Sequence, residues 1–177
     1  MKKHFATTAV ILVLSCASQV PATVPEEVFL LTQKPTYSWN WQSHGKPDSW
    51  VELFDASSAV TEAMRSRRGA VDQFDKTGKA LMFYAISSYN PKLICALLEL
   101  GAKREGVTDQ GLSALEVLDV ERPYTDPYGN PACDEMRHIC FIILSSPQYP
   151  LPRTEQAKIE AIIQNSRYQE ILRKFWY

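Results

Sequence analysis

The residues best suited to catalysis or metal binding in this sequence are its four cysteines and three histidines, which are widely scattered. Cys133, His138 and Cys140 come closest to a metal-binding cluster. Their C-x4-H-x-C spacing has no fourth ligand nearby and matches no common zinc pattern. The sequence also contains no G-x-S-x-G, H-E-x-x-H or C-x-x-C motif and no dinucleotide-binding motif. We therefore expect no catalytic residue, no bound metal and no cofactor.

Residues 1–22 have the character of an export signal. Lys2 and Lys3 precede an apolar stretch that is too short to span a bilayer. The sequence Val13-Leu14-Ser15-Cys16 resembles a bacterial lipobox, in which the cysteine is lipidated after cleavage, although Leu14 is not the favoured small residue. Val20-Pro21-Ala22 offers an ordinary signal-peptidase site instead. Both alternatives place the mature protein outside the cytoplasm, either in a bacterial periplasm or as a membrane-anchored lipoprotein.

Disulfide bonding becomes relevant for an exported chain. If Cys16 is lipidated or removed, Cys95, Cys133 and Cys140 remain. A Cys133–Cys140 bridge requires Cys133 to lie in a loop that folds back, because seven residues of regular helix separate two cysteines by about 10 Å. Cys95 is expected on the outward side of its helix, and it is either a free thiol or bridged to Cys133.

The charge of the chain argues against a nucleic-acid partner. The formal net charge is −1, and removal of residues 1–22 takes away two lysines and no acid, which leaves −3. Nucleic-acid binding needs a basic stripe. The one basic cluster, Arg65, Arg67 and Arg68, fits the solvated end of a helix. A length of 177 residues allows one modest domain.

The residues between Asp75 and Glu116 contain a pattern that repeats. Gly78-Lys79-Ala80-Leu81-Met82 opens a helical pattern, and Gly111-Leu112-Ser113-Ala114-Leu115 opens it again 33 positions later. Leu97-Leu98-Glu99-Leu100-Gly101-Ala102 closes the first copy. The period, the G-x-T-P-L type of opening and the L-L-x-x-G-A ending resemble the ankyrin-repeat family. This resemblance implies an all-α solenoid of about three to four helix-turn-helix repeats with atypical terminal caps. Leu81 and Phe83 depart from the family's usual proline and histidine.

The central repeat is expected to contain helices at Ala80–Ile86 and Pro91–Leu100. Apolar residues recur there at intervals of three and four, which predicts a buried stripe. Asn90-Pro91 suits a helix start, and Gly101 suits a left-handed C-cap.

One helix pair cannot bury its own apolar face, so neighbouring pairs must stack on it. Upstream we expect helices in Trp50–Ala56 and Val60–Met64, and downstream in Ser113–Leu118 and Ile139–Leu144. A last pair is expected at Thr154–Ile163 and Tyr168–Trp176. The predicted boundaries are therefore a segment 23–48, a repeat domain 49–177 with repeats at about 49–77, 78–110 and 111–150, an insertion at 120–134, and a terminal helical pair at 154–177.

Segment 23–48 carries two distinct patterns. Pro25–Leu31 fits a short helix with acids at its start. Tyr37, Trp39 and Trp41 then alternate with polar residues, as in an extended strand. This extended part is expected to cap the first repeat, and a free aromatic binding strip is the alternative.

In ankyrin repeats the connectors between helix pairs and the first helices form a concave face that binds other proteins. By resemblance, this face would include Gln73, Phe74, Lys76 and Lys79 from one connector, Arg104, Glu105 and Gln110 from the next, and Phe83, Ser87 and Glu116 from the helices. Phe74 is the strongest candidate because aromatic anchors dominate interfaces, with packing beneath the next connector as the alternative. The insertion adds Tyr124 and Tyr128, which either contact a partner or pack back on the scaffold.

These features predict a non-enzymatic, exported protein-binding module whose partner is another protein of the bacterial envelope. We expect no nucleic-acid partner, no small-molecule substrate, and contact with a membrane only through a lipid on Cys16. By family resemblance, such a protein would be an immunity protein that neutralises an incoming toxin or an accessory protein that assists a periplasmic enzyme. The alternative function is a secreted effector that binds a host protein.

Overall fold

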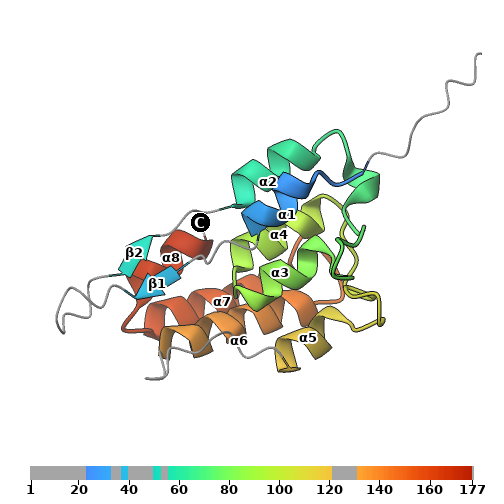
Figure 1. The fold of residues 1–177 in the computed structure, drawn as a ribbon. Helices are drawn as coiled ribbons and strands as arrows, with labels where there is room; N and C mark the ends of the chain where they lie inside the picture. Colours follow the sequence, from blue (N-terminus) through green and yellow to red (C-terminus); the bar gives the residue numbers. More distant parts are fainter. Residues whose placement is uncertain (1–22, 33–36, 40–49, 53–55, 121–130, 177) are drawn as a thin grey trace, which may run out of the picture.

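The structure, a computed structural model, describes residues 23–32, 37–39, 50–52, 56–120 and 131–176. Most of this part of the chain is helical, in agreement with the expected all-α class (Figure 1). The elements in chain order are α1 (Glu26–Thr32), β1 (Tyr37–Trp39), β2 (Trp50–Glu52), α2 (Ser57–Met64), the 3-10 helix η2 (Arg68–Ala70), α3 (Leu81–Ser87), α4 (Pro91–Glu99), α5 (Ala114–Val120), α6 (Pro131–Ser145), α7 (Arg153–Asn165) and α8 (Gln169–Trp176).

Six of the helices form three stacked pairs, which follow one another down the molecule in Figure 1. Within the pairs, α1 packs against α2, α3 against α4, and α5 against α6. Between the pairs, α3 lies between α1 and α5, and α4 lies between α2 and α6. Each pair therefore covers an apolar face of the pair before it, which a single pair could not bury alone.

The central pair owes its limits to a cap at each end of α4. Asn90 precedes α4, and its side-chain Oδ1 accepts a hydrogen bond of 2.9 Å from the Leu93 N–H. Pro91 occupies the first helical position. A backbone N–H there has no intrahelical acceptor, so the N–H that proline lacks costs no hydrogen bond. At the other end Gly101 has a φ of 93°, and the Ala102 N–H donates to the Leu97 carbonyl at 2.9 Å. The expected helices Ala80–Ile86 and Pro91–Leu100 therefore lie within one residue of α3 and α4.

The core lies between the two rows of helices. Ile94 and Leu97 of α4 are fully buried, as are Leu81 and Ile86 of α3. Burial of each such side chain contributes roughly 1.5–3 kcal/mol, so the central pair stabilises both of its neighbours.

The first helix pair differs from the expected one. Where a helix was expected from Trp50, the residues Trp50–Glu52 form β2, which pairs antiparallel with β1 so that Trp39 lies opposite Trp50. Aromatic and β-branched residues favour such a paired, pleated strand. The helix that fills the place of the expected first helix is α1, which packs against both α2 and α3. The short helix expected at Pro25–Leu31 is thus part of the stack itself.

The third pair begins its second helix earlier than expected. Val120 is the last residue of α5, and α6 starts at Pro131, within the predicted insertion 120–134. Proline suits a first helical position, which explains why the helix begins there. The chain that joins the two helices is therefore 121–130, and it lies outside the described residues.

The terminal pair does not simply continue the stack. Helix α7 packs against α6, but α8 packs against α7 and α4. Helix α5 packs mainly against α3 and α6. Among the described elements, the row formed by α1, α3 and α5 therefore ends at α5, whereas the row formed by α2, α4 and α6 is covered further.

Candidate partner-binding surface

Two connectors, residues 71–80 and 102–113, join the helix pairs and lie against each other. Lys79 and Thr108 form an antiparallel bridge. The Ala80 N–H donates to the Val107 carbonyl at 3.0 Å, and the Asp109 N–H donates to the Gly78 carbonyl at 2.7 Å. Backbone hydrogen bonds thus hold the connectors as one surface, which we call the connector face.

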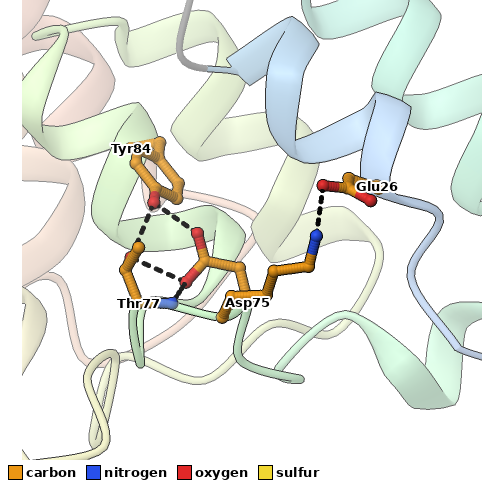
Figure 2. Close-up of polar contacts among 5 residues, drawn as sticks. Glu26, Asp75, Thr77 and Tyr84 are labelled. Atoms are coloured by element: carbon orange, nitrogen blue, oxygen red, sulfur yellow. Dashed lines mark hydrogen bonds and ion pairs between the residues drawn. The ribbon is translucent and has the colours of Figure 1, made fainter.

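Asp75 fixes the turn at the tip of the first connector (Figure 2). Its Oδ1 accepts hydrogen bonds from the Thr77 N–H at 2.8 Å, the Thr77 hydroxyl at 2.8 Å and the Lys79 N–H at 3.1 Å. Its Oδ2 accepts from the Tyr84 hydroxyl of α3 at 2.5 Å. Desolvation raises the pKa of this carboxyl, but the hydrogen bonds from Tyr84, Thr77 and Lys79 together outweigh it and lower the pKa below 3.8. The turn is therefore held by an ionised carboxylate.

Gly78 belongs to the same turn and has a φ of 74°, a conformation that favours glycine. A Cβ at this position would lie 2.3 Å from the carboxyl group of Asp109 in the neighbouring connector. The backbone angle of the turn therefore favours glycine, and a Cβ at this position would also require the exposed Asp109 side chain to move.

The first connector is also attached to the N-terminal helix. The Val24 N–H donates to the Gln73 Oε1 at 3.1 Å, and the Lys76 ammonium lies 2.8 Å from a Glu26 carboxylate oxygen. The hydrogen bond and charge of Glu26 raise the pKa of Lys76. Both members of the ion pair are well exposed, so its contribution to stability is small. Gln73 and Lys76, two predicted binding residues, thus also contact the N-terminal segment that contains α1.

Phe74 is the apolar residue that this anchored connector presents to solvent. Its side chain is 46% exposed, although residues on both sides of it are fixed by hydrogen bonds. The structure therefore does not tuck Phe74 beneath the neighbouring connector. An exposed aromatic ring on a rigid segment is a suitable anchor for a protein interface because little side-chain entropy is lost on binding.

Phe83 is not an exposed residue of the predicted concave face, contrary to the prediction from the repeat pattern. It is 6% exposed, and its ring packs edge-to-face on Tyr84 with a centroid separation of 5.4 Å. The Lys79 ammonium lies 4.1 Å from the centre of the same ring. The cation of Lys79 covers the aromatic side chain, so a partner at this point would meet Lys79 first.

Of three further predicted residues, Glu116 caps a helix, whereas Ser87 and Arg104 are half-buried. Glu116 accepts 2.7 Å hydrogen bonds from the Ser113 N–H and hydroxyl, and the Ser113 hydroxyl accepts from the Glu116 N–H at 3.3 Å. This capping box starts α5, and the hydrogen bonds from Ser113 lower the pKa of Glu116. Ser87 Oγ and Arg104 Nε and Nη2 are buried and have no hydrogen-bond partner among the described residues.

The remaining predicted contacts divide into two groups. Glu105 and Gln110 are exposed on the second connector, so the connector face includes them. Tyr124 and Tyr128 fall in residues 121–130, and Cys16 falls in residues 1–22, all outside the described part of the chain.

The structure corrects the predicted Cys133–Cys140 disulfide. Both residues belong to α6, and Cys140 is a free, fully buried thiol. On one regular helix, seven residues correspond to about 10 Å, which is too far for a disulfide. Cys95 is also a free thiol. His138 is exposed on α6 while Cys140 is buried, and no three potential ligands converge on a metal position among the described residues.

A hollow of about 690 Å³ lies between α2, α4 and the segment around Tyr149. Cys95 faces it beside Tyr149, whose hydroxyl donates to Glu99 Oε1 at 2.8 Å. Burial raises the pKa of the Cys95 thiol to about 12. The thiol is therefore neutral at physiological pH, and the hollow contains no activated cysteine nucleophile.

The sequence analysis overlooked Asp75 and Tyr84, although a signal for this turn is present. Asp75 and Thr108 occupy equivalent positions, three residues before Gly78 and Gly111. The Asp75 carboxylate accepts a hydrogen bond from the Lys79 N–H, and the Thr108 hydroxyl accepts one from the Leu112 N–H, in each case four residues later. A short polar side chain at that distance before a glycine is typical of such self-capped turns.

None of the described helices is long and apolar enough to cross a bilayer. No protein-family model, curated protein or solved structure matches the chain.

Proposed function

We propose that this chain is a non-enzymatic protein-binding module, built as a short ankyrin-like stack, that is exported to act on another protein of the bacterial envelope. The stack is supported by equivalent features 33 residues apart. Gly78 and Gly111 both have positive φ, 74° and 84°, and each precedes the first helix of a pair. Asp75 and Thr108 cap the two turns in the same way.

The packing of the helices agrees with this proposal. First helices α1, α3 and α5 follow one another in one row, and second helices α2, α4 and α6 follow one another in the other. Neighbouring connectors are joined by the Lys79–Thr108 bridge. These relations are those expected of stacked helix-turn-helix repeats.

The observation that carries the binding function is Phe74, an exposed aromatic residue on a connector held by hydrogen bonds on either side. On the same two connectors, Lys76, Glu105 and Gln110 supply exposed polar groups. A rigid apolar anchor with a polar surround is the composition of many protein interfaces.

The neutral Cys95 thiol and the lack of a converging ligand cluster in the described residues give no support to catalysis. We favour recognition because Phe74 is an exposed aromatic residue on a connector held by hydrogen bonds. Both neutralisation of an incoming envelope toxin and assistance to a periplasmic enzyme follow from export of a binding module. We rank neutralisation first, because a lipid on Cys16 would hold the protein where such toxins arrive.

The test is capture of partners from an envelope extract with the tagged full-length chain. The wild type is expected to retain one partner in a stoichiometric amount. Phe74→Ser should weaken this binding about 5–30-fold, which corresponds to 1–2 kcal/mol. The matched control is Leu30→Ser, because Leu30 is 56% exposed but lies on α1.

Recovery of no stoichiometric partner, or equal loss for both variants, would contradict the proposed function. The place of action can be tested separately with labelled palmitate. Label on Cys16 that disappears in Cys16→Ala would support a lipid-anchored protein, whereas an unlabelled chain in the culture medium would favour the secreted effector.

A further inference from the structure

The end of the stack at α5 and α6 exposes more large apolar side chains than any other place in the described part of the chain. Leu115 is 37% exposed, Phe141 51% and Val120 72%. The other exposed large apolar residues, Leu30 and Phe74, lie on separate elements. In Figure 1 α5 and α6 form the last layer of the three stacked pairs.

A hollow of about 540 Å³ runs between α5 and α6 at this end, and we call it the end groove. Leu118 lines it and is only 3% exposed, so it forms the floor. Leu115 and Phe141 form apolar walls, one from each helix. The groove therefore combines a buried apolar floor with exposed apolar sides.

The repeat itself indicates what kind of object fits there. Leu115 occupies the position in α5 that Met82 occupies in α3, 33 residues earlier. Met82 is 1% exposed, because α3 has a helix on each side, α1 and α5. Leu115 belongs to a helix whose row ends with it, and it remains accessible. A further helix packed beyond α5 would cover Leu115 as α5 helps to cover Met82.

The charged residues at the rim of the end groove indicate which charge the flank of such a helix would carry. Asp119 and Asp134 line the groove and provide two carboxylates, whereas Arg137 provides one guanidinium. Arg137 Nη2 lies 3.2 Å from Asp119 Oδ1, and its Nε donates to the Leu118 carbonyl at 3.3 Å. The guanidinium is thus already engaged within the rim, and the excess negative charge complements a basic partner.

We propose that the end groove binds an amphipathic α-helix of a partner protein, which inserts its apolar face between α5 and α6 and carries lysine or arginine along its flank. Such a helix would take the next place in the row α1, α3, α5, as amphipathic helices do in apolar grooves. This proposal rests on the proposed protein-binding function, but it uses a surface separate from the connector face.

The test uses the full-length chain and a fluorescent synthetic helix of about 15–20 residues, a length at which isolated helices become stable. The peptide carries leucines at helical spacing and lysines along the flank. One control peptide has the same residues in scrambled order, and another has glutamates in place of the lysines. Fluorescence anisotropy should show binding of the lysine-flanked helix and at least tenfold weaker binding of both controls.

Matched variants locate the peptide. Phe141→Ser should weaken binding about tenfold or more, whereas Leu30→Ser, which replaces an equally exposed residue of α1, should leave it unchanged. Asp134→Lys should weaken binding of the lysine-flanked helix and strengthen that of the glutamate-flanked one. Phe74→Ser should leave the peptide affinity unchanged, so loss of the connector-face function is distinguishable from loss of this site.

The proposal is overturned if the lysine-flanked helix does not bind, if the scrambled peptide binds as well, or if Leu30→Ser weakens binding as much as Phe141→Ser. A concentration-dependent dimer that Phe141→Ser dissolves would assign the groove to a second copy of the chain instead. Cross-linking of Phe141 to residues 121–130 of the same chain, with no peptide binding, would assign it to that segment.

Discussion

The connector face and the end groove present apolar side chains in opposite ways. In the connector face one aromatic residue, Phe74, projects from a turn organised by the Asp75 carboxylate. In the end groove, Leu115 and Phe141 stand over a floor of packed leucine, and the ion pair of Asp119 with Arg137 lies at the rim. Hydrogen bonds define the first surface, and helix packing defines the second.

This difference predicts two modes of recognition. The connector face is rigid and polar, so it gains specificity from shape and from a single anchor. The end groove presents two exposed apolar side chains over a buried leucine, so its affinity should depend on buried surface and on helical partners. Substitutions that damage packing should therefore affect the two surfaces differently from substitutions that damage hydrogen bonds.

The largest effect is expected from Leu118→Ala at the floor of the end groove. Leu118 is 3% exposed, and loss of a buried leucine side chain commonly costs about 2–5 kcal/mol of unfolding free energy. Leu115→Ala, on the exposed wall of the same groove, should cost less than about 1 kcal/mol. Urea unfolding followed by circular dichroism measures both. Equal losses for the two variants would show that the groove is not built on a packed floor.

A smaller effect is expected from Gly78→Ala in the connector face. Alanine at a φ of 74° costs about 1–2 kcal/mol, and its Cβ must also displace the Asp109 carboxyl group. Gly111→Ala has a similar φ of 84° but meets no atom within 4 Å, so it should cost only the backbone part. Thermal unfolding of both variants gives the difference, and adding Asp109→Ala to Gly78→Ala should remove it. Identical stabilities of the two single variants would contradict this prediction and show that the exposed Asp109 side chain moves aside without cost.

The smallest of the three effects concerns the pH dependence of the turn. The pKa of Asp75 is lower in the folded chain than its ordinary value of 3.8. The ionised carboxylate therefore contributes stability above about pH 4, and this contribution is lost as the pH falls through the folded-state pKa. Asp75→Asn should cost about 1 kcal/mol at pH 7, because the site is partly exposed, and almost nothing near pH 2.

Unfolding free energies from urea titrations across this range, for wild type and variant, provide the measurement. A difference between the two proteins that stays constant with pH would mean that the Asp75 carboxylate does not hold the turn through its charge.

The elements with strong local signals could be predicted from the sequence. Asn90 and Pro91 mark the start of α4 and Gly101 marks its end, because each satisfies a backbone requirement of its own position. The 33-residue spacing of Gly78 and Gly111 likewise predicts two equivalent turns, since φ is positive at both.

Features that depend on distant contacts could not be predicted in this way. Trp50–Glu52 became a strand because it pairs with Tyr37–Trp39, and no local pattern specifies that partner. By repeat spacing, Phe83 lies at a position of the predicted concave face, but Tyr84 and Lys79 cover it. Cys133 entered a helix because α6 starts at Pro131, which separates it from Cys140 and removes the expected disulfide.

The central claim, that the connector face holds another protein, is tested most directly by a photoreactive amino acid at position 74 of the full-length chain in living cells. We expect a cross-link to one envelope protein from this position. The same photoreactive residue at position 30, an exposed apolar site on α1, should give none. No cross-link at position 74, or the same products from both positions, would contradict the account.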